Sequence, residues 1–80
     1  MKRYFFDIVG HQRSELDYVG RVLPTFDEAY AAAELMAFDL AVKRADEMLG
    51  YKVTVSNPDG LKLFSVPVKA SYLSAMPMAA

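Results

Sequence analysis

The sequence predicts an α+β domain with the element order β-β-α-β-β, in which an antiparallel sheet carries one long helix packed across one face. Three observations lead to this fold class. Apolar and polar residues alternate near both ends of the chain, an alanine-rich stretch without proline or glycine fills the middle, and turn-forming residues separate these segments. We expect a single α+β domain over residues 1–68 and a flexible C-terminal tail over residues 69–80.

Two strands are expected before the helix. Residues 3–9 are rich in aromatic and β-branched side chains and predict a strand. A polar turn over residues 10–15 separates it from residues 16–23, whose alternation predicts a second strand. Gly20 inside this second segment indicates a bulge or a close approach of the backbone. The side chains on the core face of the first strand are Tyr4, Phe6 and Ile8.

A capping box marks the start of the helix. Thr25 can accept a hydrogen bond from the amide of Glu28, and the Glu28 side chain can reach back to the amide of Thr25. No proline or glycine follows until Gly50, which supplies a C-cap. The sequence therefore predicts one helix over residues 26–49, roughly 36 Å long at about 1.5 Å per residue.

A second hairpin is expected after the helix. Apolar and polar residues alternate over residues 51–56, which predicts a half-buried strand with one face in water. Residues 57–60 are expected to form a turn, with proline second and glycine fourth. Residues 61–68 return as a strand that ends at Pro67 or lies at an edge, because proline cannot donate to a ladder. The side chains expected inside are Tyr51, Val53 and Val55, and those expected in water are Lys52, Thr54 and Ser56.

The predicted helix has two apolar stripes, where a surface helix usually has one. One stripe can pack on the sheet and comprises Ala31, Leu35, Phe38, Val42, Ala45 and Leu49. The other comprises Phe26, Tyr30, Met36, Leu40 and Met48. Because a domain of this size has no second helix to cover that stripe, we expect a homodimer with the second stripe as its interface. Alternatively, the C-terminal tail folds back and covers it.

The composition leaves packing and association as the sources of stability. A chain of 80 residues buries only about 60–65% of its unfolded surface, and such domains usually need a staple. The absence of cysteine excludes disulfides, thiolate metal sites and a cysteine nucleophile. A net charge of −1 does not favour nucleic acid as a partner. No stretch approaches the roughly 20 apolar residues of a membrane span, so we expect a cytoplasmic protein without a membrane partner.

His11 is the one histidine, and it could act as a base or bind a metal together with Asp7, Glu15 and Asp17. We expect it instead to be a solvated residue of a polar turn. The serines lack a nucleophile elbow, and the four glycines are isolated, so no phosphate loop is present. We therefore predict no catalytic residue, no metal site and no cofactor, with an enzyme based on His11 as an alternative.

Aromatic residues of the predicted strands offer a further alternative. They could stack a small ligand or nucleic-acid bases on the sheet, with Arg3, Lys52 and Lys62 beside them. Strand alternation already assigns most of these aromatic residues to the core. The leading expectation is therefore a non-enzymatic protein-interaction or regulatory module that acts as a homodimer. The aromatic residues concerned are Tyr4, Phe5, Phe6, Tyr18, Tyr51 and Phe64.

Residues 3–68 resemble a family of short, uncharacterised proteobacterial proteins. Members commonly have an aspartate-glycine pair in the first turn and a tryptophan near position 51, where this chain has Gly10-His11 and Tyr51. The resemblance implies no function. It rests on Arg3, Tyr4, Phe5, Phe6, Asp7, Asp17, Gly20, Leu23, Pro24, Glu28, Ala29, Asp59, Gly60, Val66 and Pro67.

A more remote resemblance concerns the start of the helix. A strand pair followed by Thr25, Glu28, Ala29 and Ala33 at these spacings is similar to the partial RNase-H-like domain of HicB-type antitoxins. This resemblance implies a toxin-binding or regulatory module without catalysis of its own. That domain usually carries Pro-Asp-Leu-Pro-Gly before its helix, whereas this chain has Gly-Arg-Val-Leu-Pro over residues 20–24.

Overall fold

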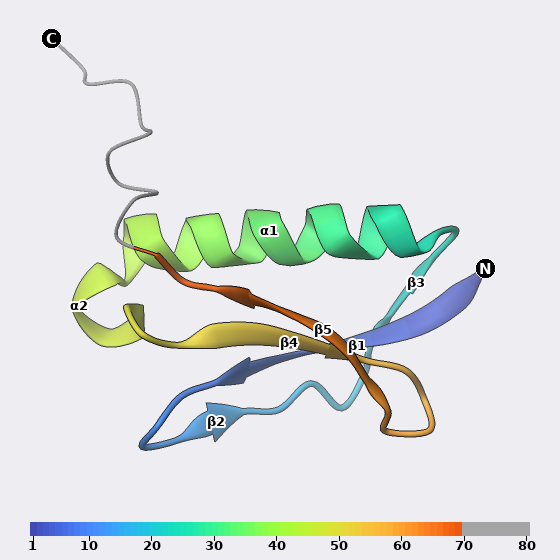
Figure 1. Cartoon of the computed structure of the whole chain (residues 1–80), viewed down its shortest axis with the longest axis horizontal. Helices are drawn as coiled ribbons and strands as arrows, with labels where there is room; N and C mark the ends of the chain where they lie inside the picture. Colours follow the sequence, from blue (N-terminus) through green and yellow to red (C-terminus); the bar gives the residue numbers. More distant parts are fainter. Residues whose placement is uncertain (70–80) are drawn as a thin grey trace, which may run out of the picture.

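The computed structural model describes residues 1–69, apart from the side chain of Ala45. The strands are β1 (Lys2–Val9), β2 (Ser14–Glu15), β3 (Arg21–Leu23), β4 (Lys52–Ser56) and β5 (Lys62–Pro67), and the helices are α1 (Phe26–Lys43) and α2 (Ala45–Met48). An antiparallel sheet carries α1 across one face, which confirms the predicted α+β class (Figure 1). The predicted tail, residues 69–80, lies outside the described residues from position 70 onwards.

Strands β1 and β4 form the centre of the sheet. The order is β2-β1-β4-β5, and β3 pairs with β1 on the side that β2 also uses. Phe6 lies opposite Val55 and Ile8 opposite Val53, so these side chains share the face that α1 covers. Tyr4 and Phe6 are buried, as the alternation of residues 3–9 predicts, and Ile8 packs against the core from its margin.

Helix α1 rests on the sheet through a ridge of alanines. Four alanines spaced four residues apart have no exposed surface: Ala29, Ala33, Ala37 and Ala41. This ridge lets the helix backbone approach β4 and β5 closely. The predicted packing face of the helix is therefore wrong. Two residues of the stripe expected on the sheet, Ala31 and Leu35, lie on the opposite side of α1, where Ala31 is exposed and Leu35 is 63% exposed.

The predicted 24-residue helix is broken at Arg44. The backbone there leaves the helical region, with φ −136° and ψ 40°, and the Arg44 carbonyl then accepts hydrogen bonds from the amides of Glu47 and Met48 at 3.0 and 2.9 Å. An 18-residue α1 spans about 27 Å, which matches the roughly 26 Å of an eight-residue β1. The break returns the chain to the sheet and places Met48 in the core.

The second predicted strand is not continuous. Of the predicted residues 16–23, only β3 pairs with β1, and residues 16–20 form a loop. The short strand β2 lies inside the predicted polar turn over residues 10–15 and pairs with the end of β1. Leu16 and Tyr18, expected on a common strand face, are 52% and 84% exposed. The close approach expected at Gly20 is confirmed: its φ is +76°, and a Cβ there would lie 2.9 Å from Cγ of Arg3.

The β4–β5 hairpin forms as predicted, and β5 lies at the edge of the sheet. The amide of Gly60 donates to the Asn57 carbonyl at 3.0 Å, which closes the turn. The wet face predicted for β4 is wrong in part, because Thr54 and Ser56 are only 2% and 8% exposed. Neighbouring strands flank β4 on both sides, and the Thr54 hydroxyl lies 3.1 Å from that of Ser65.

Candidate functional site

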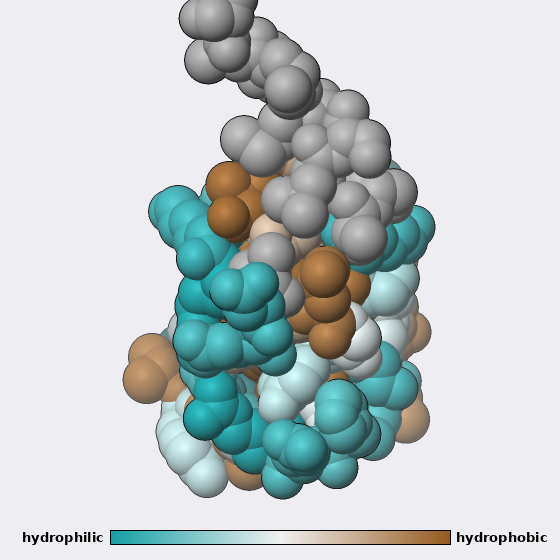
Figure 2. All heavy atoms as spheres, turned by 90° about the vertical axis from the view of Figure 1, so that its left-hand side faces the viewer, coloured by the Kyte–Doolittle hydropathy of each residue, from teal (hydrophilic) through white to brown (hydrophobic). Residues whose placement is uncertain are grey.

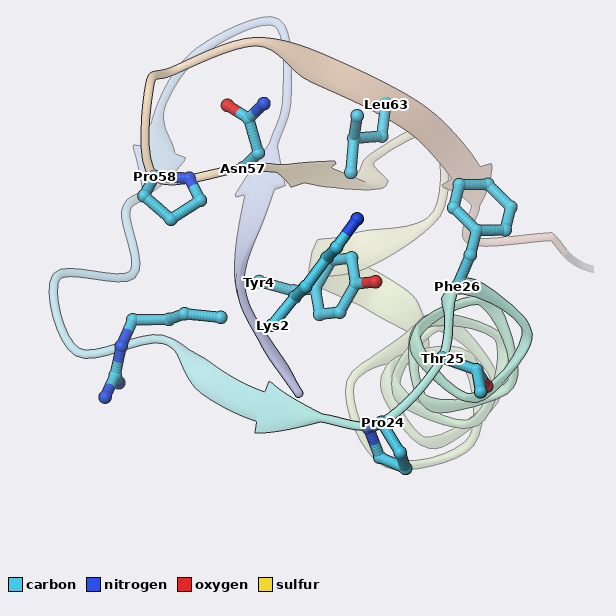
Figure 3. Close-up of a pocket in the computed structure, with 9 residues that line it drawn as sticks. Lys2, Tyr4, Pro24, Thr25, Phe26, Asn57, Pro58 and Leu63 are labelled. Atoms are coloured by element: carbon cyan, nitrogen blue, oxygen red, sulfur yellow. The ribbon is translucent and has the colours of Figure 1, made fainter.

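A pocket opens where the start of β1, the N-terminus of α1 and the turn after β4 meet. Its volume is about 470 Å³. Figure 3 shows the Lys2 amine and the Tyr4 hydroxyl near its middle, with Phe26 and Leu63 on one side and Asn57 and Pro58 on another. The lining is mixed, with cationic, neutral polar and apolar groups. The residues that line it are Lys2, Arg3, Tyr4, Pro24, Thr25, Phe26, Asn57, Pro58 and Leu63.

The N-cap of α1 fixes the helix side of this pocket. The Thr25 hydroxyl oxygen accepts a hydrogen bond from the amide of Glu28 at 3.1 Å, so the Thr25 half of the predicted capping box is formed. The first turn of a helix leaves backbone amides without intrahelical partners, and it carries the positive end of the helix dipole. The pocket therefore borders the start of α1, where the carboxylates of Asp27 and Glu28 in the first turn oppose the positive end of the dipole.

An aromatic cluster lies beside the pocket, between α1 and the edge strand β5. The rings of Phe26 and Phe64 are 5.0 Å apart in an edge-to-face arrangement, and those of Tyr30 and Phe64 are 5.1 Å apart. Phe26 remains 49% exposed and Tyr30 42% exposed. We call Phe26, Tyr30 and Phe64 the aromatic cluster.

Asp17 ties the loop between β2 and β3 to the centre of β1. One carboxylate oxygen accepts the Phe6 amide at 3.1 Å, and the other accepts the amides of Val19 and Gly20 at 3.0 and 2.9 Å. A further hydrogen bond joins the loop to β1, because the Asp17 amide donates to the carboxylate of Asp7 at 2.8 Å. A side chain thus replaces the missing strand pairing at this point, which explains why the predicted second strand is interrupted.

The charge state of Asp17 follows from these contacts. Partial burial acts to raise the pKa of its carboxyl, because burial disfavours the charged form. The backbone amide donors, with Gly20 the strongest, and the positive charge of Arg21 act in the opposite direction and outweigh burial. The pKa of Asp17 therefore lies below its ordinary value of 3.8.

Asp17→Ala is expected to lower the free energy of unfolding at pH 7 by about 2–3 kcal/mol, because three backbone amides lose their acceptor. Since folding depresses the pKa, the ionised carboxylate stabilises the fold above pH 3.8 and loses this contribution as the pH falls below it. Denaturant titrations at pH 7 and at about pH 2 measure the difference between the two proteins. Asp39→Ala, on the exposed side of α1, is the control. An unchanged difference at both pH values would contradict the assignment.

His11 lies at the other end of the molecule, near α2. It is exposed in the turn after β1, and its ring meets Tyr51 edge-on at 6.0 Å. Glu15 instead pairs with Arg44 at 3.7 Å. Within residues 1–69, no three histidine or carboxylate side chains are grouped so that they could hold a metal ion. His11, Asp7, Glu15 and Asp17 are therefore not assembled into the metal site that the alternative reading requires.

Charged side chains dominate this α2 end. Arg13 and Arg44 both contact the carboxylate of Glu47, at 3.3 and 3.1 Å. Figure 2 views this end and shows hydrophilic side chains over most of the visible described surface, with apolar ones in separate areas. The pocket and the aromatic cluster, near the N-terminus of α1, are the more apolar candidates for binding.

The five residues expected at an interface do not form one exposed stripe. Phe26 and Tyr30 are half exposed, and both belong to the aromatic cluster. Met36 and Leu40 are partly buried against the core beside the alanine ridge. Met48 has no exposed surface and cannot contribute to an interface in this fold. The break at Arg44 is the reason, because it turns Met48 inwards.

Sequence reasoning missed two features of these sites. Tyr4 was expected in the core, which is where its ring lies, but its hydroxyl end lines the pocket with Lys2. The residues that complete the pocket come from distant positions, so no local pattern reveals it. The role of Asp17 has a weak local signal, since an aspartate followed three residues later by glycine is typical of a turn that the carboxylate closes.

None of the helices in residues 1–69 is long and apolar enough to cross a membrane. No curated protein and no solved structure matches the chain. The resemblance to HicB-type antitoxins consequently finds no support. Residues 3–69 match the domain of unknown function DUF6894, which agrees with the expected membership of an uncharacterised family. The chain therefore belongs to the DUF6894 family.

Proposed function

We propose that the protein is a non-enzymatic interaction module that acts as a homodimer. The observation that supports this proposal is the aromatic cluster, in which Phe26 and Tyr30 remain half exposed above Phe64. Aromatic residues are enriched where proteins meet, because they bury a large area at a low cost in side-chain entropy. No charged side chain belongs to the cluster.

We infer that a second copy of the chain binds to this surface. Two copies related by a two-fold axis present the same patch to each other, and an uncharged patch meets itself without repulsion. A domain this small buries limited apolar area and usually needs a staple, and the chain has no cysteine to form one. Association with a second copy is the source of additional stability that we infer.

Side chains, more than strand pairing, would carry this contact. The amide of Val68 donates to the Tyr51 carbonyl at 2.8 Å, so by alternation the backbone of Pro67 faces away from β4. Proline has no N–H to offer a neighbouring strand, and a register shift between Val55 and Ser56 further distorts the hairpin. The edge of β5 is thus poorly suited to extending the sheet, while the aromatic cluster beside it remains available.

Tyr30→Glu is expected to convert a dimer into a monomer without unfolding it, because a charge would then be desolvated at the centre of the contact. Leu35→Glu is the matched control: Leu35 lies on the same helix, is 63% exposed, and belongs to the face away from the cluster. Native mass spectrometry and sedimentation of the wild type and both variants measure the assembly, and circular dichroism confirms folding.

Two results would contradict a homodimer formed through the aromatic cluster. One is a wild-type protein that stays monomeric at high micromolar concentration. The other is dissociation by Leu35→Glu but not by Tyr30→Glu, which would place the interface on the outer face of α1. A dimer that only Tyr30→Glu dissociates would support the proposal and direct the search for further partners to the dimer's remaining surface.

A further inference from the structure

The pocket at the N-terminus of α1 contains a nearly buried tyrosine whose hydroxyl has no partner within residues 1–69. Tyr4 is 4% exposed, and no hydrogen bond joins its hydroxyl to any group in residues 1–69. Every side-chain nitrogen or oxygen that is fully buried in this part of the chain does have a partner. The hydroxyl must therefore reach solvent, and it does so in the pocket that Tyr4 lines (Figure 3).

A cation lines the same pocket as this hydroxyl. The Lys2 amine points into the same space, and no ion pair within the described residues occupies it (Figure 3). The other cation of the lining, Arg3, is directed elsewhere, since its guanidinium donates to the Val19 carbonyl at 2.7 Å. No acidic residue lines the pocket. The polar part of the pocket thus offers donors and one available positive charge.

The rest of the lining is apolar. Pro24 and Phe26, at the start of α1, and Pro58 and Leu63, from the β4–β5 hairpin, supply its apolar groups. A volume of about 470 Å³ lies within the range of small-molecule sites, which combine apolar walls with a few converging polar groups. The site therefore suits a ligand with one anionic end and an apolar body.

We propose that this pocket binds a small monocarboxylic acid, whose carboxylate accepts hydrogen bonds from Lys2 and Tyr4 and whose apolar body packs against Phe26 and Leu63. A single ammonium balances a single carboxylate. Phosphate groups carry more charge and are typically held by several cations or by a bidentate arginine, which this pocket does not provide.

Titration of the full-length ¹⁵N-labelled protein with phenylacetate, followed by two-dimensional NMR, tests the proposal. We expect saturable shifts of the Tyr4, Phe26 and Leu63 amides with a Kd on the order of 0.1–1 mM, a range typical of a ligand of this size. Phenylacetamide has the same shape without the charge, and inorganic phosphate has charge without the apolar body. Both are expected to bind at least about tenfold more weakly.

Two variants test the assigned contacts. Tyr4→Phe removes only a hydroxyl that has no partner among the described residues, so we expect the fold to be retained. Lys2→Gln removes an exposed charge. Each is expected to weaken phenylacetate binding by about five- to tenfold. Lys62→Gln, an exposed lysine outside the pocket, is the matched control and should bind like the wild type.

Three outcomes would overturn the carboxylate site. They are the absence of saturable shifts at the pocket, phosphate binding as tight as that of phenylacetate, and wild-type affinity in both Tyr4→Phe and Lys2→Gln. The dimer proposal is tested separately, since neither variant alters Phe26, Tyr30 or Phe64. Shifts of Tyr30 and Phe64 without shifts of Tyr4 and Leu63 would also count against the pocket, because they would place phenylacetate on the surface beside it.

Discussion

Gly10→Ala is expected to lower the free energy of unfolding by about 3 kcal/mol, because it forces a methyl group into a filled space. A Cβ at Gly10 would lie 2.6 Å from Cδ2 of Tyr51, with Cε2 and Cζ closer still. The Tyr51 ring is 6% exposed and belongs to the core, so it cannot rotate away freely. Denaturant unfolding of the two proteins measures the difference.

A matched glycine separates this clash from the general effect of adding a side chain. Gly60→Ala meets no atom within 4 Å, although its φ of +86° disfavours alanine. It is therefore expected to cost only about 1–2 kcal/mol. In a Tyr51→Val background, Gly10→Ala should cost less than about 1 kcal/mol, because the ring that causes the overlap is gone. Equal costs in both backgrounds would show that Tyr51 is not the obstacle.

Ala33→Leu is expected to have a comparable effect, about 3 kcal/mol, by pushing α1 away from the sheet. Ala33 lies in the middle of the alanine ridge and has no exposed surface. Its neighbour Ala31 is exposed on the same helix and gives the control with the same chemical change. Ala31→Leu should alter stability by no more than about 0.5 kcal/mol.

The contrast between these two alanines is the direct test of how α1 packs. Thermal and denaturant unfolding of both leucine variants should show a large loss for Ala33→Leu alone. Similar values for both would mean that the helix presents a different face to the sheet. A loss confined to Ala31→Leu would restore the stripe containing Leu35 as the packed face.

The features predicted correctly from the sequence are those that neighbouring residues determine. The N-cap at Thr25, the turn from Asn57 to Gly60 and the core face of β1 each depend on a few adjacent side chains. The α+β class follows from the order of these local signals. The position of Pro67 on an edge strand also follows, because its missing N–H restricts it to such a place.

The features predicted wrongly depend on distant parts of the chain. The helix break at Arg44 is one example. It matches the length of the sheet beneath α1, and no glycine or proline at that position marks it in the sequence. The sequence pattern does not indicate the alanine ridge, because large apolar residues dominate any stripe on a helix, whereas close packing on a sheet favours small ones. The interruption of the second strand depends on Asp17 reaching the amide of Phe6.

The candidate site likewise has a part that the sequence predicts and a part that it does not. Phe26 and Tyr30 were expected at a contact surface from their helical spacing, and they do lie on the surface over Phe64. The pocket could not be predicted, because Tyr4, Pro24 and Pro58 meet only after the helix has crossed the sheet. Whether a tyrosine hydroxyl has a partner is likewise a property of the folded chain.

The central position of β1 has a consequence for the behaviour of the protein at high concentration. Its run of aromatic and β-branched residues is the kind of segment that forms intermolecular cross-β ladders when left unpaired. In the folded protein β4 occupies one side of it, and β2 and β3 occupy parts of the other, with Asp17 holding the amide between them. This strand is thereby kept away from both edges of the sheet, so folding itself keeps its backbone from pairing with other chains.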